Sequence, residues 1–275
     1  MEELLLRAKE LGYPALALTD HDNLCGAMHF AQVARSLDLQ PIIGAELTLK
    51  DGSHLTLLAE TRQGYSNLCR LITCAYVSGG RKTPGLELRH LPEYARGIIL
   101  LTGCPRGQLP RLAAQGNLAD AEACLRQYLE WFGAANVFVE LQQNLVQGDL
   151  QRNRRLTELA SRLGVGVGAT NNVHYHVRER HRLQDALVAI RHRKSLEETH
   201  QERRPNGQFY LKSPQEMAVL FKSCPQALSN TLRVVVVTME VVRSLDSWEE
   251  ASLRKRCWAS PAKAGKLLQK PELRS

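Results

Sequence analysis

The 275-residue sequence has no apolar run long enough to cross a lipid bilayer, which takes about 20 residues. The most apolar stretch, at 234–237, is soon interrupted by Thr238 and Glu240. The first residues are acidic and then amphipathic, unlike a secretory signal peptide with its basic start and apolar centre. We therefore expect a cytoplasmic protein that has no membrane partner.

Paired cysteines are also missing. The seven cysteines are an odd number and form no Cys-x-x-Cys pair, which argues against a disulfide framework and against a zinc ribbon. There is no Walker lysine and no nucleophile elbow. The alternating glycines Gly164, Gly166 and Gly168 continue as a strand instead of leading into a helix, as a dinucleotide-binding loop would. The chemistry of the protein must come from other residues.

Charge of one sign is concentrated only near the end of the sequence. Lys and Arg number 36 against 28 Asp and Glu, and residues 251–275 contain seven basic side chains and one acidic. Such a tail fits either contact with nucleic acid or a solvated, disordered end. A second basic stretch, 191–204, is interleaved with glutamates and is interpreted as a solvated loop, with a phosphate contact as the alternative.

What the sequence does contain is a regular alternation of short apolar strands and amphipathic helices. This alternation is typical of parallel β/α architecture. The pattern is lost after about residue 233, where we expect a domain boundary. The expected helices are 1–13, 27–37, 64–77, 107–114, 118–132, 148–163, 178–192 and 213–222, and the expected strands are 15–19, 41–49, 54–59, 97–103, 137–141 and 165–170.

Polar side chains recur where these strands begin or end. In a β/α barrel, the side chains at the carboxyl ends of the strands converge on one face. Imidazole, carboxylate and thiolate are ligands of zinc and manganese, and such ions activate water and hold phosphate oxygens in phosphoester hydrolysis. The alternative, that each residue only completes a local turn or cap, stays open. The predicted metal ligands are His21, Glu46, His54, Cys104 and His174.

Several segments resemble successive motifs of the polymerase-and-histidinol-phosphatase (PHP) domain, in the version that opens bacterial DNA polymerase III α subunits. They are ALTDHDNLCG (17–26), PIIGAEL (41–47), HLTLLAE (54–60), LLTGCPRG (100–107) and ATNNVHYH (169–176). Two further segments, HVRERHRLQDALVAIRHRKS (176–195) and FYLKSPQEMAVLF (209–221), are most similar to the error-prone type of these polymerases. The resemblance extends from about residue 1 to 233.

The resemblance implies an α/β fold, a distorted seven-stranded, TIM-like β/α barrel, here without its first strand. It implies a PHP barrel over 1–195 and a helical connection over 196–233 toward a polymerase palm that is absent. A basic tail over 234–275 follows, beyond the resemblance. The resemblance also implies up to three metal ions at the carboxyl ends of the strands, and the five predicted ligands match ligand positions of that cluster.

Three positions depart from the pattern of the family. The His-x-His pair of the first strand is absent, Asn172 stands where metal-binding members carry Asp, and Asn144 stands about where many carry His. Fewer imidazole and anionic donors predict weaker binding, so we expect partial occupancy by zinc or manganese and negligible hydrolysis. A truncated or frame-shifted gene product would explain both the missing strand and the patternless tail.

The implied function is that of a PHP portion of an error-prone DNA polymerase III α-type subunit. The parent would be a nucleotidyltransferase acting in DNA replication and repair, with DNA and other polymerase or repair subunits as partners. This portion would be at most a weak metal-dependent phosphoesterase or 3′–5′ exonuclease. Two alternatives stay open: a free-standing metal-dependent phosphoesterase, and a non-catalytic scaffold. The sequence identifies no DNA-binding residue.

Overall fold

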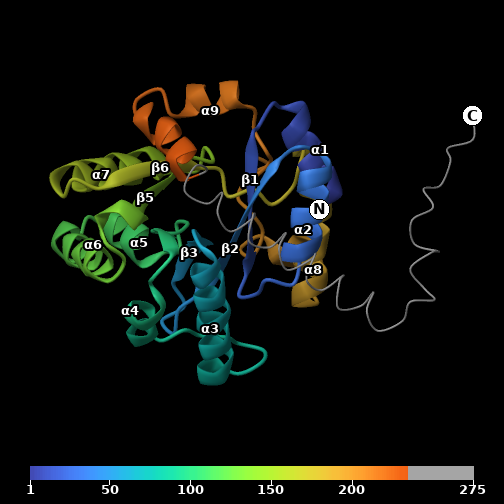
Figure 1. Cartoon of the computed structure of the whole chain (residues 1–275). Helices are drawn as coiled ribbons and strands as arrows, with labels where there is room; N and C mark the ends of the chain where they lie inside the picture. The colour runs from blue at the N-terminus through green and yellow to red at the C-terminus, as the bar shows by residue number, and fades with distance from the viewer. Residues whose placement is uncertain (235–275) are drawn as a thin grey trace, which may run out of the picture.

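A curled, six-stranded sheet forms the centre of the protein, with strand order β1-β2-β3-β4-β5-β6. The computed structural model describes residues 1–234, so the predicted basic tail lies outside the described residues except for its first residue. Figure 1 shows the sheet as half of a barrel. The strands are β1 (Ala15–His21), β2 (Gln40–Thr48), β3 (His54–Ala59), β4 (Ile98–Leu101), β5 (Val137–Gln142) and β6 (Gly166–Thr170).

Helices connect the strands and surround the sheet (Figure 1). The eight expected helices are confirmed to within three residues at most ends. One short helix was not expected, because four residues are too few to show a periodic pattern. The helices are α1 (Glu2–Glu10), α2 (Ala27–Ser36), α3 (Arg62–Gly79), α4 (Leu91–Tyr94), α5 (Gln108–Gln115), α6 (Leu118–Phe132), α7 (Asp149–Arg162), α8 (His181–His192) and α9 (Pro214–Leu220).

The prediction of a purely parallel sheet is wrong for one strand. The pairs β1–β2, β4–β5 and β5–β6 are parallel, whereas β3 runs antiparallel to both β2 and β4. The reason is the short connection at 49–53, which turns at Asp51 and Gly52, whereas a parallel crossover needs a dozen or more residues. The reversal places His54, the first residue of β3, beside the carboxyl end of β2.

The sheet is open within the described residues. β1 and β6 are its two edges and do not pair with each other. Residues 1–234 therefore form a mixed α/β half-barrel of six strands. A seven-stranded, TIM-like barrel was expected without its first strand, and within these residues no strand bridges the two edges.

The concave face of the sheet is apolar at one end and polar at the other. Ile42 and Phe138 belong to one buried cluster on this face. Since alternate residues of a strand face the same side, Glu46 lies on the face of Ile42, and Glu140 lies on the face of Phe138. A Cβ at Gly166 would lie 3.0 Å from the Phe138 ring. The alternating glycines of β6 thus leave space for this ring and do not form a phosphate loop.

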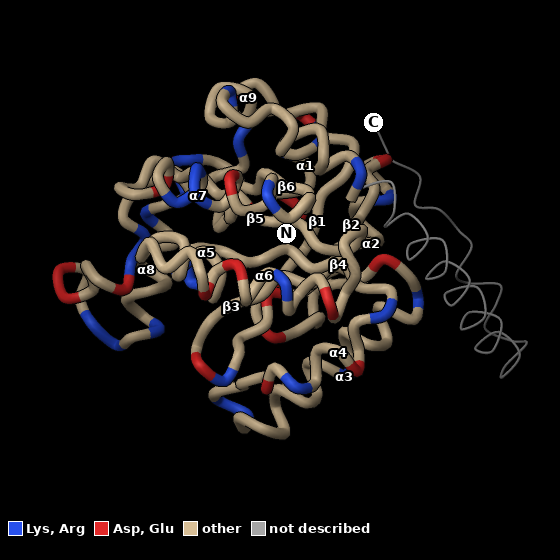
Figure 2. The backbone as a smooth tube through the Cα atoms, turned by 90° about the vertical axis from the view of Figure 1, so that its left-hand side faces the viewer, with Lys and Arg blue, Asp and Glu red and all other residues tan. Residues whose placement is uncertain are grey.

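The convex face packs against α3, α6 and α7. Leu57 of β3, Val139 of β5, Leu68 of α3 and Tyr128 of α6 are all fully buried in the largest apolar cluster. Basic and acidic residues are interspersed along the backbone (Figure 2). Between residues 1 and 234, every helix is too short or too polar to pass through a lipid bilayer.

Candidate metal centre

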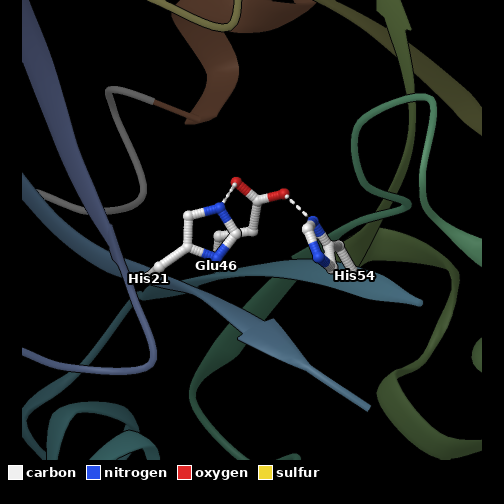
Figure 3. Close-up of side chains that lie close together, drawn as sticks. All are labelled: His21, Glu46 and His54. Carbon is white, nitrogen blue, oxygen red and sulfur yellow. Dashed lines mark hydrogen bonds and ion pairs between the residues drawn. The ribbon is translucent and has the colours of Figure 1, made fainter. Parts of the chain in front are cut away.

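One carboxylate joins two imidazoles at the polar end of the concave face. Glu46 Oε1 accepts a hydrogen bond from His54 Nδ1 at 2.7 Å, and Glu46 Oε2 lies 3.2 Å from His21 Nε2. Figure 3 shows the carboxylate lying between the two rings. The strand register produces this arrangement, because His21 is the pairing partner of Glu46, and His54 pairs with Thr48, two residues further along β2.

The three side chains form a gradient from solvent to interior. The side chain of His21 is 47% exposed, that of Glu46 is 13% exposed and that of His54 is 4% exposed. One ligand atom from each lies within 4.8 Å of the others. Two nitrogen donors and one carboxylate fit a zinc or manganese ion that also binds a fourth ligand. The half-exposed His21 is the ligand of the three that is most in contact with solvent.

The electrostatics of the cluster favour an ionised Glu46. Burial raises the pKa of this carboxyl, but the hydrogen bond from His54, the charge of His21 and the thiol of Cys104 outweigh burial and lower the pKa to about 2. Because a carboxylate only accepts hydrogen bonds, the imidazole nitrogens that face it carry protons. A bound metal ion would need one lone pair from each ring.

Cys104 joins the same cluster from the loop after β4. Its Sγ lies 3.4 Å from His54 Nδ1. Burial, followed by the negative charge of Glu46, raises the pKa of the Cys104 thiol, so the thiol is protonated at neutral pH. The loop approaches β3 closely at Gly103, which has φ of 93° and where a Cβ would lie 2.5 Å from the His54 carbonyl oxygen. Glycine is required for this approach.

His174, the fifth predicted ligand, is held by an arginine instead of the carboxylate. Arg204 Nη2 donates a hydrogen bond to His174 Nε2 at 2.5 Å. Burial and the charge of Arg204 lower the pKa of His174 to about 4, although Glu46 raises it. The imidazole is therefore neutral at pH 7. The structure brings together His21, Glu46, His54 and Cys104, and it places His174 beside them with its Nε2 already occupied.

The two asparagines at departing positions differ in their surroundings. Asn144 is buried, and its Nδ2 donates to the Asn171 carbonyl at 3.0 Å, so it ties the loop after β5 to the loop after β6. Asn172 has a left-handed backbone, with φ of 48°, and is partly exposed in the loop that leads to His174. An aspartate at position 172 could occupy the same place in its loop as Asn172 does. A histidine at position 144 could not reproduce the hydrogen bonds that the Asn144 side chain makes.

Sequence reasoning missed two residues of this region. Glu140 is buried below the cluster, where Gly103 N–H, Gln142 Nε2 and Thr170 Oγ1 donate to its carboxylate at 3.1, 2.8 and 2.5 Å. Burial raises its pKa. A single glutamate inside the apolar strand 137–141 was the available signal. Arg204 belongs to the stretch interpreted as a solvated loop, and that interpretation is wrong for Arg204, which is half-buried against His174.

The model of the PHP domain family matches residues 1–144. Four of the five predicted ligands, His21, Glu46, His54 and Cys104, lie inside that range. His174 and Arg204 lie beyond it.

The sequence is also similar to curated DNA polymerases. It is 40% identical over 250 residues to an error-prone DNA polymerase of Symbiobacterium thermophilum, covering 85% of this chain and 23% of that protein. It is 37% identical over 248 residues to a DNA polymerase III subunit alpha of Treponema pallidum, covering 85% and 21%. The chain thus spans less than a quarter of the length of these relatives. A crystal structure from Bifidobacterium adolescentis, named as a metal-dependent phosphoesterase, aligns with a TM-score of 0.40 and 14% identity, covering 62% of this chain and 80% of that one.

Proposed function

Because the chain belongs to the PHP domain family, we propose that it acts as the PHP portion of an error-prone type of DNA polymerase III α subunit. The observation that carries this proposal is the extent of the similarity. Identity of about 40% to polymerases covers 85% of the chain, whereas the PHP match ends at residue 144. The polymerase resemblance therefore continues through the segments after β5, which a free-standing phosphoesterase would have no reason to share.

The proposed role of the centre is to bind one divalent ion. His21, Glu46 and His54 would hold zinc or manganese, and Cys104 is the nearest candidate for a fourth ligand. When bound, such an ion supplies Lewis-acid stabilisation of phosphate oxygens. Glu46 orients both imidazoles, and the Gly103 loop keeps Cys104 against His54. Glu140 supports this loop through the Gly103 N–H.

The ligands present fit a centre that binds an ion and supports the polymerase better than one that hydrolyses phosphoesters. Phosphoester cleavage commonly uses two ions about 4 Å apart. A second ion would need the carboxylate that Asn172 lacks and the Nε2 of His174, to which Arg204 donates. The parent protein would copy DNA in the cytoplasm together with other polymerase or repair subunits. Within that parent, a seven-stranded barrel would be completed by a strand between β1 and β6.

Metal content and activity of the purified chain test the proposal. Inductively coupled plasma mass spectrometry should find about one zinc or manganese per chain, and His21→Ala should lose it. His29→Ala is the matched control, since His29 is another exposed histidine that pairs with a glutamate, at 3.4 Å from Glu2. Templated primer extension by this chain, or brisk metal-dependent cleavage of a phosphodiester, would contradict the proposal and favour a complete polymerase or a free-standing phosphoesterase, respectively.

A further inference from the structure

Arg204 is a half-buried cation beside the metal centre, and the two side chains that it contacts, His174 and Phe209, are uncharged. Its Nη2 donates to the neutral His174 Nε2, and its guanidinium carbon lies 5.1 Å from the centre of the Phe209 ring. Within residues 1–234, no carboxylate lies at ion-pair distance from it. The preceding residue differs, because Arg203 pairs with Asp185 at 3.1 Å. The charge of Arg204 thus lacks the compensation that its neighbour has.

Most of the hydrogen-bonding capacity of Arg204 is unused. A guanidinium carries five N–H donors in a planar fork, and only one donates to an acceptor in the described part of the chain. Phe209 fixes the plane of this fork from one face. The Phe209 carbonyl also accepts a hydrogen bond from the His174 backbone N–H at 2.8 Å. Phe209 therefore positions both the arginine and the histidine. The fork is positioned before any ligand arrives.

The surroundings of Arg204 attract an anion. Arg106, in the loop that carries Cys104, is exposed and is likewise without an ion pair inside residues 1–234. Its charge acts on both His21 and Arg204, and Glu46 and Cys104 act on Arg204 as well, so these groups lie within electrostatic range of one another. Two arginines and a divalent ion carry four positive charges, against three negative charges on Glu46, Asp20 and Asp22, the carboxylates that interact electrostatically with His21. The site as a whole is therefore complementary to an anion.

We propose that Arg204 binds the phosphate group of a ligand at the metal centre. The planar fork of arginine matches the oxygens of phosphate in a two-point contact. The inference rests on the proposed function, because the phosphate would lie between Arg204 and the ion held by Glu46, His21 and His54. The phosphate could come from the end of a DNA strand or from within it, and both sources present the same oxygens.

A purely structural role explains the contacts of Arg204 less well. A half-buried charge that faces a neutral imidazole loses hydration without an equal electrostatic return. If the only task were to hold His174, a neutral donor such as glutamine would be sufficient. A phosphate supplies the missing negative charge and accepts the unused donors. The arginine also comes from the segment after residue 196, so polymerase-like sequence completes a site that begins in the PHP match.

Isothermal titration with inorganic phosphate tests this inference, on the metal-free chain and on the manganese-loaded chain. Arg204→Ala should weaken phosphate binding at least tenfold, and Arg204→Lys should weaken it less, because charge remains but the fork is lost. Arg154→Ala is the matched control: Arg154 is 81% exposed, pairs with Glu158 at 2.9 Å and lies on α7, so binding should be unchanged. Arg204→Lys keeps the test decisive if the alanine variant does not fold.

Competition identifies the source of the phosphate. Displacement of inorganic phosphate by thymidine 5′-monophosphate indicates a terminal phosphate, and displacement by the dinucleotide TpT indicates an internal one. Displacement by neither would overturn the inference, as would equal phosphate binding by the unaltered chain and both Arg204 variants. Metal content is measured on the same samples. A chain without metal that still binds phosphate through Arg204 would contradict the proposed metal centre and leave the arginine assignment supported.

Discussion

At the residue scale, Glu46 is the group on which the candidate centre depends. Its carboxylate contacts both imidazoles, and each contact uses a different oxygen. A protein interior accepts such a charge only when hydrogen bonds compensate for lost hydration. His54, His21 and Cys104 supply that compensation here, which is why the pKa falls in spite of burial. The same contacts keep the ligands arranged before an ion binds.

Replacing Glu46→Gln should therefore remove both metal and stability. The amide keeps the shape but offers one acceptor instead of two, so an imidazole N–H loses its partner. We expect the free energy of unfolding in urea to fall by about 1–3 kcal/mol and bound metal to fall below detection. Glu158→Gln, on an exposed ion pair, should cost less than about 1 kcal/mol. Equal losses in the two variants would show that Glu46 has no special role.

Lys212 gives a pH-dependent prediction. It is 3% exposed, and its Nζ donates to Asn171 Oδ1 at 3.1 Å. Burial lowers its pKa to about 8 from 10.5, so between these values the unfolded chain binds more protons and stability rises with pH. The rise attributable to Lys212 should approach about 3 kcal/mol. Lys212→Met should remove it, whereas exposed Lys222→Met should not. Urea unfolding at pH 7 and pH 10 measures the difference, and parallel pH profiles for all three chains would disprove it.

At the element scale, periodicity predicts the strands and helices but not the direction of every strand. The apolar runs of β1, β4, β5 and β6 were expected, and so were the helices between them. β3 was expected as a strand, but its direction depends on the five-residue connection at 49–53, which turns at Asp51 and Gly52. That reversal brings His54 to Glu46. Arg204 could not be predicted, because it lies in an irregular segment and its contacts with His174 and Phe209 exist only in three dimensions.

Two glycines in different loops, one after β2 and one after β4, allow a comparison. Gly52 and Gly103 both have positive φ, but a Cβ at Gly52 meets no atom within 4 Å, whereas one at Gly103 meets the His54 carbonyl oxygen at 2.5 Å. Gly52→Ala should cost about 1–2 kcal/mol from backbone strain alone. Gly103→Ala should cost an additional 1–3 kcal/mol or so from overpacking and should reduce metal content by displacing His54. Urea unfolding and metal analysis of both variants decide this, and the idea is wrong if Gly103→Ala retains metal.

At the scale of the whole molecule, the candidate ligands lie on both sides of an open half-barrel. His21, Glu46 and His54 come from β1, β2 and β3, whereas Asn172 and His174 follow β6, the opposite edge strand. The pKa of His174 responds to the charges of Glu46 and His21, so the two groups are electrostatically coupled. An ion bound by both would link the two edges of the sheet. In this chain, the β6 side contributes the amide of Asn172 and the imidazole of His174, whose Nε2 already accepts a hydrogen bond from Arg204.

Asn172→Asp should therefore strengthen the linkage between metal binding and the stability of the entire fold. A ligand that binds only the folded state stabilises it according to its affinity, and a tenfold gain in affinity is worth about 1.4 kcal/mol. A charged oxygen at position 172 should provide roughly that gain, because the left-handed backbone there tolerates aspartate. Manganese should therefore raise Tm further in the variant than in the unaltered chain.

Asn136→Asp is the control. It adds the same charge just before β5, at the other end of the strands, and should leave the metal-dependent shift of Tm unchanged. Thermal unfolding with manganese and with EDTA measures both. A shift of the same size in all three chains would mean that position 172 does not reach the ion.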